Sequence, residues 1–366
     1  MPIYMDVHIV PGVKAIDVAA AHQLDLAHQT DHGCKCMTYW IDEERENIFC
    51  LIEAPSKEAV MNLHNDAHGL IPSKIIEVSS AVVTSFLGRI YDPETAENSP
   101  EGLKVFTDPS FRILLLTKIT DPFLLRHQLG AAKAGELLDR HNEIVRRNLL
   151  LHGGREAEYE GSSFVISFSS ASKAVACAVA IQKEMQQLSE APFIFQVAIH
   201  AGEPVAHSNE LFGETIQFAH YMCAVAGQFQ IALTSSVREL VSKDYFHPER
   251  KFFVSMSRQD EDLLKLLFTQ LEDHWQDADF DLTRYCHLTT MSISQLYRKT
   301  MALTGLSPNA LLKEFRLEKA KQLMRKQHCN VAQVTFDCGF SSPSYFTKCF
   351  KKKFGLLPMA YLELLH

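Results

Sequence analysis

Residues 331–361 read VAQVTFDCGFSSPSYFTKCFKKKFGLLPMAY, and this stretch decides the fold of the C-terminal part of the chain. It predicts a short apolar helix from Val331, a turn at Cys338–Phe340, and a second helix opening at Ser341 or Ser342. Pro343 would then lie in the first turn of that helix, which is typical of a helix N-terminus. The second helix interleaves aromatic residues with lysines (Tyr345, Phe346, Phe350, Phe354; Lys348, Lys351, Lys352, Lys353). Aromatic residues at helical spacing predict a buried face, and the lysines predict a face for phosphates and base edges.

A second helix-turn-helix pattern lies upstream. Leu282–Cys286 predicts its first helix, His287–Met291 its turn, and Ser292 the cap of a recognition helix that ends at Gly305. In that helix, Leu296 and Met301 are expected to pack inward. The intervening residues 307–327 predict a long amphipathic helix with apolar residues at Leu311, Leu312, Phe315, Leu317, Ala320, Leu323 and Met324. Two such units on one linker helix can enter two successive major-groove segments.

Over about 100 residues, this segment resembles the DNA-binding domain of AraC-type regulators. The matching positions are Ser292, Leu296, Arg298, Gly305, Pro308, Arg316, Ala320, Gly339, Phe340, Tyr345, Phe346, Phe350, Lys351, Phe354, Gly355 and Pro358. The resemblance implies sequence-specific binding to double-stranded DNA. The expected contact residues are Ser294, Gln295, Arg298, Lys299, Ser342, Ser344, Thr347, Lys348, Lys351 and Lys352. The alternative is a helical interaction domain that never touches DNA.

Charge is divided unevenly along the chain. Residues 281–366 hold thirteen Lys and Arg against five Asp and Glu, whereas residues 1–280 hold 23 against 39. A basic segment on an acidic body is the charge distribution expected of a nucleic-acid-binding module joined to a sensor.

Length and composition favour a multidomain protein of the reducing cytoplasm. The 366 residues predict two or three domains, no apolar run is long enough to span a membrane, and the N-terminus lacks a signal-peptide pattern. Nine scattered cysteines favour reduced thiols over a disulfide framework. The expected segments are a first domain at 1–92, a polar linker at 93–108, a middle domain at 109–247 and the DNA-binding domain at 258–366.

The first segment predicts a ferredoxin-like βαββαβ domain. The expected strands are Ile3–Val10, Lys35–Asp42, Asn47–Ala54 and Ser73–Ser80, and the expected helices are Ala15–His32 and Ser56–His68. In this arrangement His8, Cys50, His64 and His68 would converge at one edge. His64 and His68 are four residues apart on one helix, a spacing that lets two imidazoles share a metal. Imidazole and thiolate ligands favour nickel, zinc, copper, cobalt or iron over magnesium or calcium. The alternative is that these histidines cap helices or line a dimer interface.

Three stretches of this segment, Tyr4–His8, Thr38–Pro55 and Ala59–Val78, resemble a small bacterial family of ferredoxin-like fold, some members of which bind nickel. The resemblance makes nickel the favoured metal and adds Asp6, His22, Asp25 and Glu53 as further ligands or supporting residues. Two other pairs were considered. Cys34 and Cys36 form either a redox or soft-metal pair or two buried thiols, and His28 and His32 form a weaker i,i+4 pair.

Residues 112–240 resemble the class III nucleotide cyclase domain. The likeness lies in the helices, in Gly153-Gly154, in HAGEP (200–204), and in Phe212-Gly213. Such cyclases need two carboxylates to hold two metal ions, and an Asn and an Arg that act on the substrate. Here the four positions are taken by Lys118, Ser162, Gln217 and Tyr221, although Asp121 lies near the first. The resemblance therefore implies a domain without catalysis that serves as a dimerisation unit, a ligand site or a rigid spacer.

Together these patterns predict a multidomain chain of mixed α+β and all-α class that regulates transcription in response to a transition metal. The expected partners are promoter DNA, RNA polymerase and a second copy of the chain, with no membrane. Two alternatives remain: a nucleotide or other organic ligand in the cyclase-like cleft, and an active nucleotide cyclase.

Overall fold

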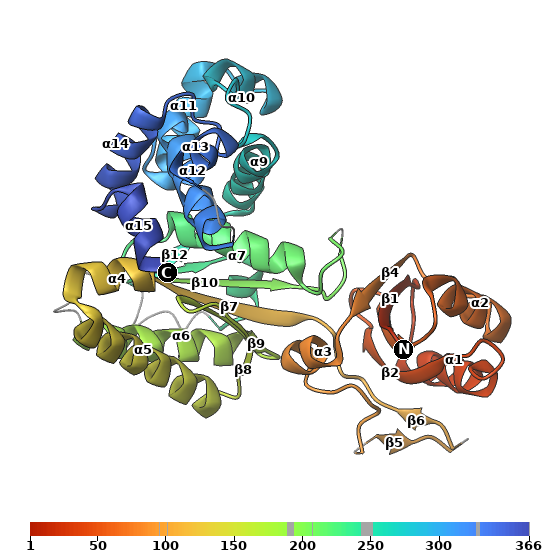
Figure 1. The fold of residues 1–366 in the computed structure, drawn as a ribbon. Helices are drawn as coiled ribbons and strands as arrows, with labels where there is room; N and C mark the ends of the chain where they lie inside the picture. The colour runs from red at the N-terminus through yellow and green to blue at the C-terminus, as the bar shows by residue number, and fades with distance from the viewer. Residues whose placement is uncertain are drawn as a thin grey trace.

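The computed structural model describes residues 1–94, 96–100, 102–188, 194–206, 208–242, 252–326 and 330–365. The chain forms a first, a middle and a C-terminal domain. In Figure 1 the first domain lies to one side of the middle domain, and the C-terminal domain packs above the middle domain. Within the described ranges, every helix is too short or too polar to span a lipid bilayer.

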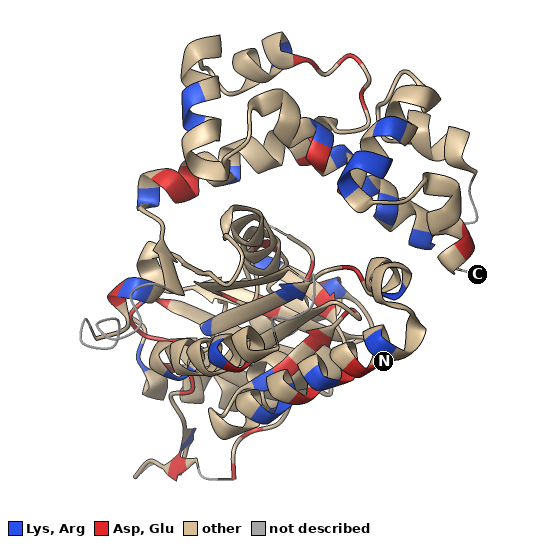
Figure 2. Cartoon of the chain, turned by 90° about the vertical axis from the view of Figure 1, so that its left-hand side faces the viewer, with Lys and Arg blue, Asp and Glu red and all other residues tan. Residues whose placement is uncertain are grey.

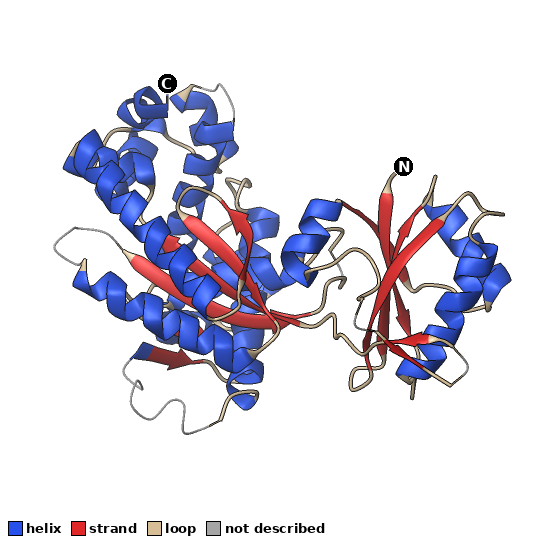
Figure 3. Ribbon diagram, turned by 90° about the horizontal axis from the view of Figure 1, so that it is seen from below, coloured by secondary structure: helices blue, strands red, loops and turns tan. Residues whose placement is uncertain are grey.

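The first domain is a four-stranded antiparallel sheet of order β2-β3-β1-β4 with helices on one face (Figure 3). Its elements are β1 (Ile3–Ile9), α1 (Ala15–His28), β2 (Lys35–Asp42), β3 (Asn47–Glu53), α2 (Lys57–Ala67) and β4 (Lys74–Val78). This confirms the predicted ferredoxin-like βαββαβ fold. Helix α1 ends four residues before the predicted His32, because the chain turns at Thr30–Gly33, where Gly33 takes a left-handed φ of 64°.

Strand alternation sorts the side chains of β1 between two cores. Tyr4 packs under α1 and α2, whereas Met5 and Val7 join a core that continues through helix α3 (Ser80–Leu87) into the middle domain. A stacked contact between Phe86 of α3 and Phe212, with ring centroids 5.0 Å apart, lies in this shared core. The sequence patterns did not predict α3.

Part of the predicted linker packs back onto the first domain. It forms a small hairpin of β5 (Glu97–Asn98) and β6 (Lys104–Val105), and Phe106 stacks on Tyr39 with ring centroids 4.1 Å apart. The backbone N–H of Ile41 donates to Asp108 O (3.2 Å). Residues 104–108 thus lie against the first domain, with Phe106 buried and Lys104, Thr107 and Asp108 exposed.

The middle domain is built on a six-stranded sheet of order β12-β11-β10-β7-β9-β8. Its elements are β7 (Arg112–Ile119), α4 (Pro122–Leu129), α5 (Ala131–Leu151), β8 (Arg155–Tyr159), β9 (Ser163–Phe168), α6 (Ala171–Gln187), β10 (Phe195–Gly202), α7 (Gly213–Val225), β11 (Ile231–Leu233), α8 (Ser235–Glu239) and β12 (Phe253–Ser255). The apolar stripes of α5 and α6 cover one face of the sheet, and α7 covers the other (Figure 1).

The C-terminal domain is all-α, as predicted, with two helix-turn-helix units joined by one long helix. Its helices are α9 (Arg258–His274), α10 (Leu282–Leu288), α11 (Ile293–Thr304), α12 (Pro308–Lys326), α13 (Val331–Asp337), α14 (Pro343–Phe354) and α15 (Pro358–Leu365). Gly305 and Gly355 end the two recognition helices, α11 and α14, with left-handed φ values of 69° and 82°. Glycine is suited to that backbone conformation because it has no Cβ.

Candidate metal centre and nucleic-acid interface

The sheet of the first domain places three polar side chains under its helices. Asp6 and His8 occupy alternate positions of β1 and therefore share the helix-facing side. Cys50 of β3 pairs with Asp6 across the two strands. All three side chains are buried. The alternation that builds the core of this face thus also brings a carboxylate, an imidazole and a thiol together.

The two helices supply the other half of this cluster. His64 of α2 lies between two carboxylates: its Nε2 is 3.1 Å from Asp6 Oδ2 and its Nδ1 is 3.1 Å from Asp25 Oδ1. His68, one turn further along, has its Nε2 3.2 Å from the same oxygen of Asp25. His8 Nε2 lies 3.1 Å from Asp6 Oδ1. One donor atom each from Asp6, His8, Cys50 and His64 lie within 4.8 Å of one another.

Burial and charge set the protonation of this cluster. Burial alone would lower the pKa of His64, but the Asp6 charge and hydrogen bonds to both carboxylates raise it to about 10. Burial alone would raise the pKa of Asp6 and of Asp25, but His64 and the neighbouring histidines bring both below the usual range. Burial, followed by the charges of Asp6 and Asp25, raises the pKa of the Cys50 thiol well above its ordinary value. Without a metal, the cluster is an imidazolium between carboxylates beside a neutral thiol.

The residues present fit a transition metal. Three buried polar atoms at this site lack a regular hydrogen bond: His8 Nδ1, and also Asp6 Oδ1 and His22 Nε2, whose charged neighbours are His8 Nε2 (3.1 Å) and Asp92 Oδ2 (3.7 Å). Buried polar atoms without partners are costly, and a cation would satisfy lone pairs here. A cavity of about 20 Å³ adjoins them, lined in part by His8, His22, Asp25, Cys50 and His68, which is room for a single ion. Imidazole, thiolate and carboxylate together suit nickel, zinc, copper or cobalt.

The other candidate ligands lie apart from this cluster or at its margin. Glu53 is at the opposite end of β3 and pairs with the N-terminal amine (3.3 Å), so the structure does not bring it to the cluster. His22 lines the cavity, and its Nε2 lies 3.7 Å from Asp92 Oδ2. Asp92 directly precedes the polar linker, and no spacing pattern in the sequence indicated that it would reach His22.

The two further pairs considered from the sequence do not form a second site. His28 Nδ1 bonds to Leu24 O (2.9 Å), while His32 lies beyond the end of α1 with its Nε2 3.1 Å from Asp66 Oδ2. They therefore do not share a helix face. Cys34 and Cys36 are both buried in the apolar core under the helices, and burial raises the pKa of both thiols. This favours the interpretation as two buried thiols.

In the first recognition helix, the expected DNA-contact residues are exposed. Ser294, Gln295, Arg298 and Lys299 of α11 all face solvent. Gln295 is also part of a capping box, in which its Oε1 accepts from the Ser292 N–H (3.0 Å).

The structure corrects the expectation that Met301 packs inward. Its side chain is 37% exposed, and Thr300 is buried beside the predicted Leu296. Positions 296 and 300 lie on one face because they are four apart, and Met301 falls one residue outside that stripe.

In the second recognition helix, Ser344, Lys348, Lys351 and Lys352 are exposed, and Thr347 is half-buried. Ser342 is the helix cap, and its hydroxyl accepts from the Tyr345 N–H (3.3 Å). Figure 2, viewed from the side on which α14 and α15 lie in Figure 1, shows Lys and Arg along the facing helices of this domain. The domain therefore presents cations on an open helical surface.

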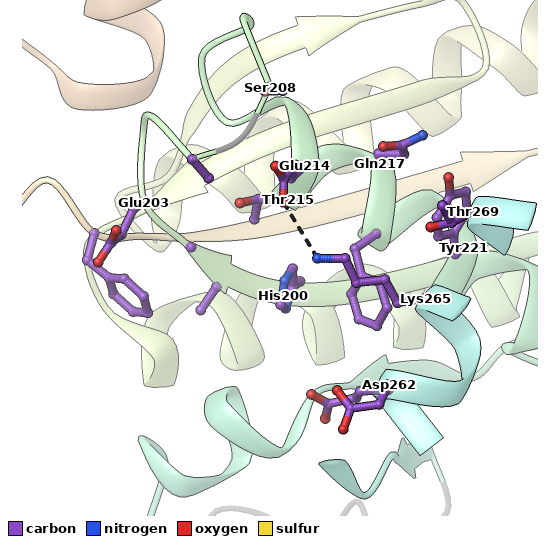
Figure 4. A pocket seen from close by; sticks show the side chains of 16 residues that line it. His200, Glu203, Ser208, Glu214, Thr215, Gln217, Tyr221, Asp262, Lys265 and Thr269 are labelled. Carbon is purple, nitrogen blue, oxygen red and sulfur yellow. Dashed lines mark ion pairs between the residues drawn. The ribbon is translucent and has the colours of Figure 1, made fainter. Parts of the chain in front are cut away.

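The middle domain has a cavity of about 810 Å³ between α7 and α9. Two of the positions that correspond to cyclase catalytic residues, Gln217 and Tyr221, line it, with His200 at its floor (Figure 4). Its charged residues are Glu203, Glu214, Glu261, Asp262 and Lys265. The only ion pair drawn between the residues of Figure 4 joins Lys265 Nζ to Glu214 Oε2 (3.6 Å). Carboxylates thus outnumber cations around this cavity.

The remaining cyclase-like positions also lack catalytic groups. Lys118 is at the end of β7, and Ser162 lies in the turn between β8 and β9. Asp121, which could have replaced the missing carboxylate near Lys118, caps α4 and is 5% exposed. Its Oδ2 accepts hydrogen bonds from Arg325 and Tyr361 of the C-terminal domain. Its carboxylate is thus committed to the domain contact.

Comparison with known proteins identifies both ends of the chain. Residues 4–78 match the family described as nickel responsive protein SCO4226-like, and residues 285–363 match a helix-turn-helix domain family. The SCO4226 structure from Streptomyces coelicolor A3(2) is 38% identical, with a TM-score of 0.20, and covers 21% of this chain and 94% of that chain. The structure of a bacterial light-regulated adenylyl cyclase is 12% identical, with a TM-score of 0.32, and the match covers 66% of this chain and 88% of that chain.

Two of the curated relatives each match about 100 residues of the chain. A protein named histidine kinase P4 from Formosa agariphila is 37% identical over 108 residues, which is 30% of this chain and 8% of that protein. The HTH-type transcriptional activator RhaS of Escherichia coli is 33% identical over 95 residues, which is 26% of this chain and 34% of RhaS. The chain thus spans about a third or less of the length of these relatives. Residues 4–78 are thus similar to the SCO4226-like family, and residues 285–363 to a helix-turn-helix domain family.

Proposed function

We propose that this chain is a transcriptional regulator that binds double-stranded DNA and responds to a transition metal, with nickel favoured. The observation that carries the proposal is the buried cluster of Asp6, His8, Cys50 and His64, formed within the segment that matches a nickel-responsive family. It is coupled in one chain to two helix-turn-helix units with exposed cations. A DNA-binding function also implies action in the cytoplasm, recruitment of RNA polymerase and a homodimer on paired half-sites.

His8, Cys50, His64 and His68 would hold the metal, with Asp6 and Asp25 as ligands or as hydrogen-bonding supports. A bound metal supplies positive charge that replaces the proton on His64 and holds Cys50 as a thiolate. Asp25 is placed to orient His64 and His68 together, since its Oδ1 lies within about 3.2 Å of both. The metal acts as a switch only if one domain arrangement binds it more tightly, by roughly 1–3 kcal/mol.

The sheet offers a route for that response. The helix-facing side of β1 carries the metal cluster, and its other side joins the core shared with the middle domain. Polar contacts add to this link: Asn47 Nδ2 donates to Glu203 Oε1 (2.8 Å), and Lys74 Nζ to Ser208 O (2.6 Å). A shift of β1 or β3 on metal binding would therefore reach the middle domain.

The test is a nickel titration of the full chain with a parallel measurement of DNA binding. We expect about one metal per chain in the wild type, loss of that stoichiometry in His64→Ala with His68→Ala, and a nickel-dependent change in promoter affinity. Glu53→Gln is the matched control, because it changes a carboxylate of the same strand far from the cluster. Unchanged nickel stoichiometry in the double variant would remove the proposed site.

The cavity between α7 and α9 supports a second candidate, a regulator that responds to a small organic ligand. Its four carboxylates around Lys265 favour a cation and disfavour a nucleotide triphosphate. Calorimetric titration with spermidine and with ATP separates this candidate from the first. Residual cyclase activity is not expected, because Lys118 and Ser162 stand where metal-binding carboxylates are needed; turnover of ATP with manganese would contradict this.

A further inference from the structure

The C-terminal domain packs on one face of the middle domain through a buried polar contact at Asp121. The Oδ2 atom of Asp121 accepts from the Tyr361 hydroxyl (2.9 Å) and from Arg325, and Lys321 Nζ lies 3.4 Å away. Arg325 Nε in turn donates to the Tyr361 hydroxyl (2.9 Å). The partners of Asp121 therefore come from both α12 and α15. Buried charged groups with several hydrogen bonds specify one geometry, because a shifted arrangement would leave a charge unpaired.

Apolar contacts surround this polar centre. Leu124 of α4 is 5% exposed and belongs to the core of the second helix-turn-helix unit, with Leu317 and Phe350. The Phe123 ring lies edge-on to Tyr361 at 6.3 Å, and the Arg325 guanidinium is 5.6 Å from the centre of that Phe123 ring. A helix of the middle domain thus completes a core of the C-terminal domain.

The first helix-turn-helix unit is held by a separate contact. The Tyr221 ring of α7 stacks on Phe268 of α9, with centroids 4.6 Å apart. Helix α9 is tied to this unit because the Tyr285 hydroxyl of α10 donates to Leu267 O (3.0 Å). Each unit therefore has its own attachment to the middle domain.

Helix α12 connects the contact at Asp121 to the second recognition helix. Lys353 of α14 reaches Glu314 Oε2 (2.6 Å) and Glu318 Oε1 (3.0 Å) of α12. Burial alone would raise the pKa of Glu318, but the charges of Lys321 and Lys353 lower it. Two positions at or beside those where the cyclase resemblance calls for catalytic groups, Asp121 and Tyr221, thus contact the C-terminal domain instead.

We propose that this face of the middle domain, marked by Asp121 and Tyr221, is a docking surface for the C-terminal domain of the same chain. It holds both helix-turn-helix units in one arrangement relative to the rest of the molecule. This docking surface transmits the binding of metal in the first domain to the DNA-binding domain, an inference that rests on the proposed function.

Hydrogen–deuterium exchange of the full chain tests the docking itself. Asp121→Asn keeps a good helix cap but removes the charge, and Tyr361→Phe removes only a hydroxyl. Each is expected to speed amide exchange in 122–129 and 358–365 by roughly tenfold or more. Asp139→Asn, on the exposed surface of α5, is the charge-matched control and should leave both segments unchanged. Because both substitutions act on one contact, the exchange rate in the double variant should be only slightly higher than in the faster of the two single variants.

Wild-type exchange rates at both segments in Asp121→Asn and Tyr361→Phe would overturn the proposal. Protection that weakens on dilution of the wild type would also overturn it, because the docking would then be between two copies. Fluorescence anisotropy with promoter DNA tests the functional consequence. Both variants should keep metal-free affinity within about threefold of the wild type but lose its nickel-induced change. A wild type with no nickel response would contradict the proposed function, while the exchange data would still decide the docking.

Discussion

Cys50 is the residue that most sharply distinguishes a soft-metal centre from a cluster of buried histidines. Its thiol is buried beside Asp6, and burial, followed by the Asp6 charge, raises the pKa of the thiol well above its ordinary value. We expect nickel or cobalt binding to produce a thiolate-to-metal charge-transfer band in the near ultraviolet. Cys50→Ser should lose this band and at least about tenfold in affinity. Cys36→Ser, another buried thiol of the same domain, should retain both; a retained band in Cys50→Ser would exclude the thiolate ligand.

Arg298 carries the most specific DNA prediction, because its planar guanidinium can form two hydrogen bonds with one guanine. It is exposed on α11, two residues after the buried Leu296. Arg298→Ala should weaken binding to the cognate site by about 1–3 kcal/mol and relax specificity at one base pair. Lys352→Ala should weaken all sequences about equally, because a lysine at the end of α14 is expected to meet phosphate. Less than a twofold change for Arg298→Ala would exclude that base contact.

At the scale of elements, Ser342 has two roles that can be separated. Its hydroxyl caps α14, and it is also a predicted DNA contact. Ser342→Ala should destabilise the domain by about 1 kcal/mol. Ser342→Asp should keep the cap, and hence the melting temperature, while weakening DNA binding through charge repulsion. Wild-type DNA affinity in Ser342→Asp would leave only the capping role.

Helix α5 carries a buried histidine that predicts acid sensitivity. Burial lowers the pKa of His141 to about 4, against the opposing effect of its bond to Asn142, and its ring lies 5.7 Å from that of Phe164. Because the folded-state pKa is below the unfolded value of about 6.5, only the unfolded chain takes up the proton between these values. Stability should therefore fall by about 2 kcal/mol from pH 7 to pH 5 on account of this residue. In urea unfolding, His141→Leu should show a correspondingly smaller loss; an equal loss would contradict the assignment.

The elements themselves were largely predictable, because each rests on local pattern. The ferredoxin-like order of the elements and the four-residue spacing of His64 and His68 were enough to expect that they converge with His8 and Cys50. The errors have local causes too. Met301 was expected inside on its hydrophobicity, but the buried stripe of α11 is narrow and Thr300 fills it. The end of α1 was misplaced because a glycine turn at Gly33 stops it early.

At the scale of the whole molecule, the domain contacts could not be predicted. Asp121 and Arg325 are 204 residues apart, and neither belongs to a periodic pattern that would indicate its partner. Asp121 even has an ordinary local role as a helix cap, which is all that the sequence around it indicates. Contacts of this kind depend on the shapes of two finished domains rather than on neighbouring residues.

Whole-molecule charge gives a further prediction. The five exposed cations expected at DNA are Arg298, Lys299, Lys348, Lys351 and Lys352. If all meet phosphate or bases, the slope of log K against log salt concentration should be about −4 to −5 per protomer. A slope near zero in anisotropy titrations between low and moderate salt would contradict a DNA interface built from these residues.

The part of the linker that packs back onto the first domain affects how such multidomain chains can be assembled from parts. Residues 104–108 lie against the first domain, where Phe106 stacks on Tyr39 and Arg89 Nε pairs with Asp108 Oδ2 (3.1 Å). A gene fusion cut after residue 92 would remove Phe106 and expose the face of Tyr39 on which it stacks. The first domain with its packed linker segment therefore spans residues 1–108, and recombination that joins it to other output modules would have to break the gene beyond that point.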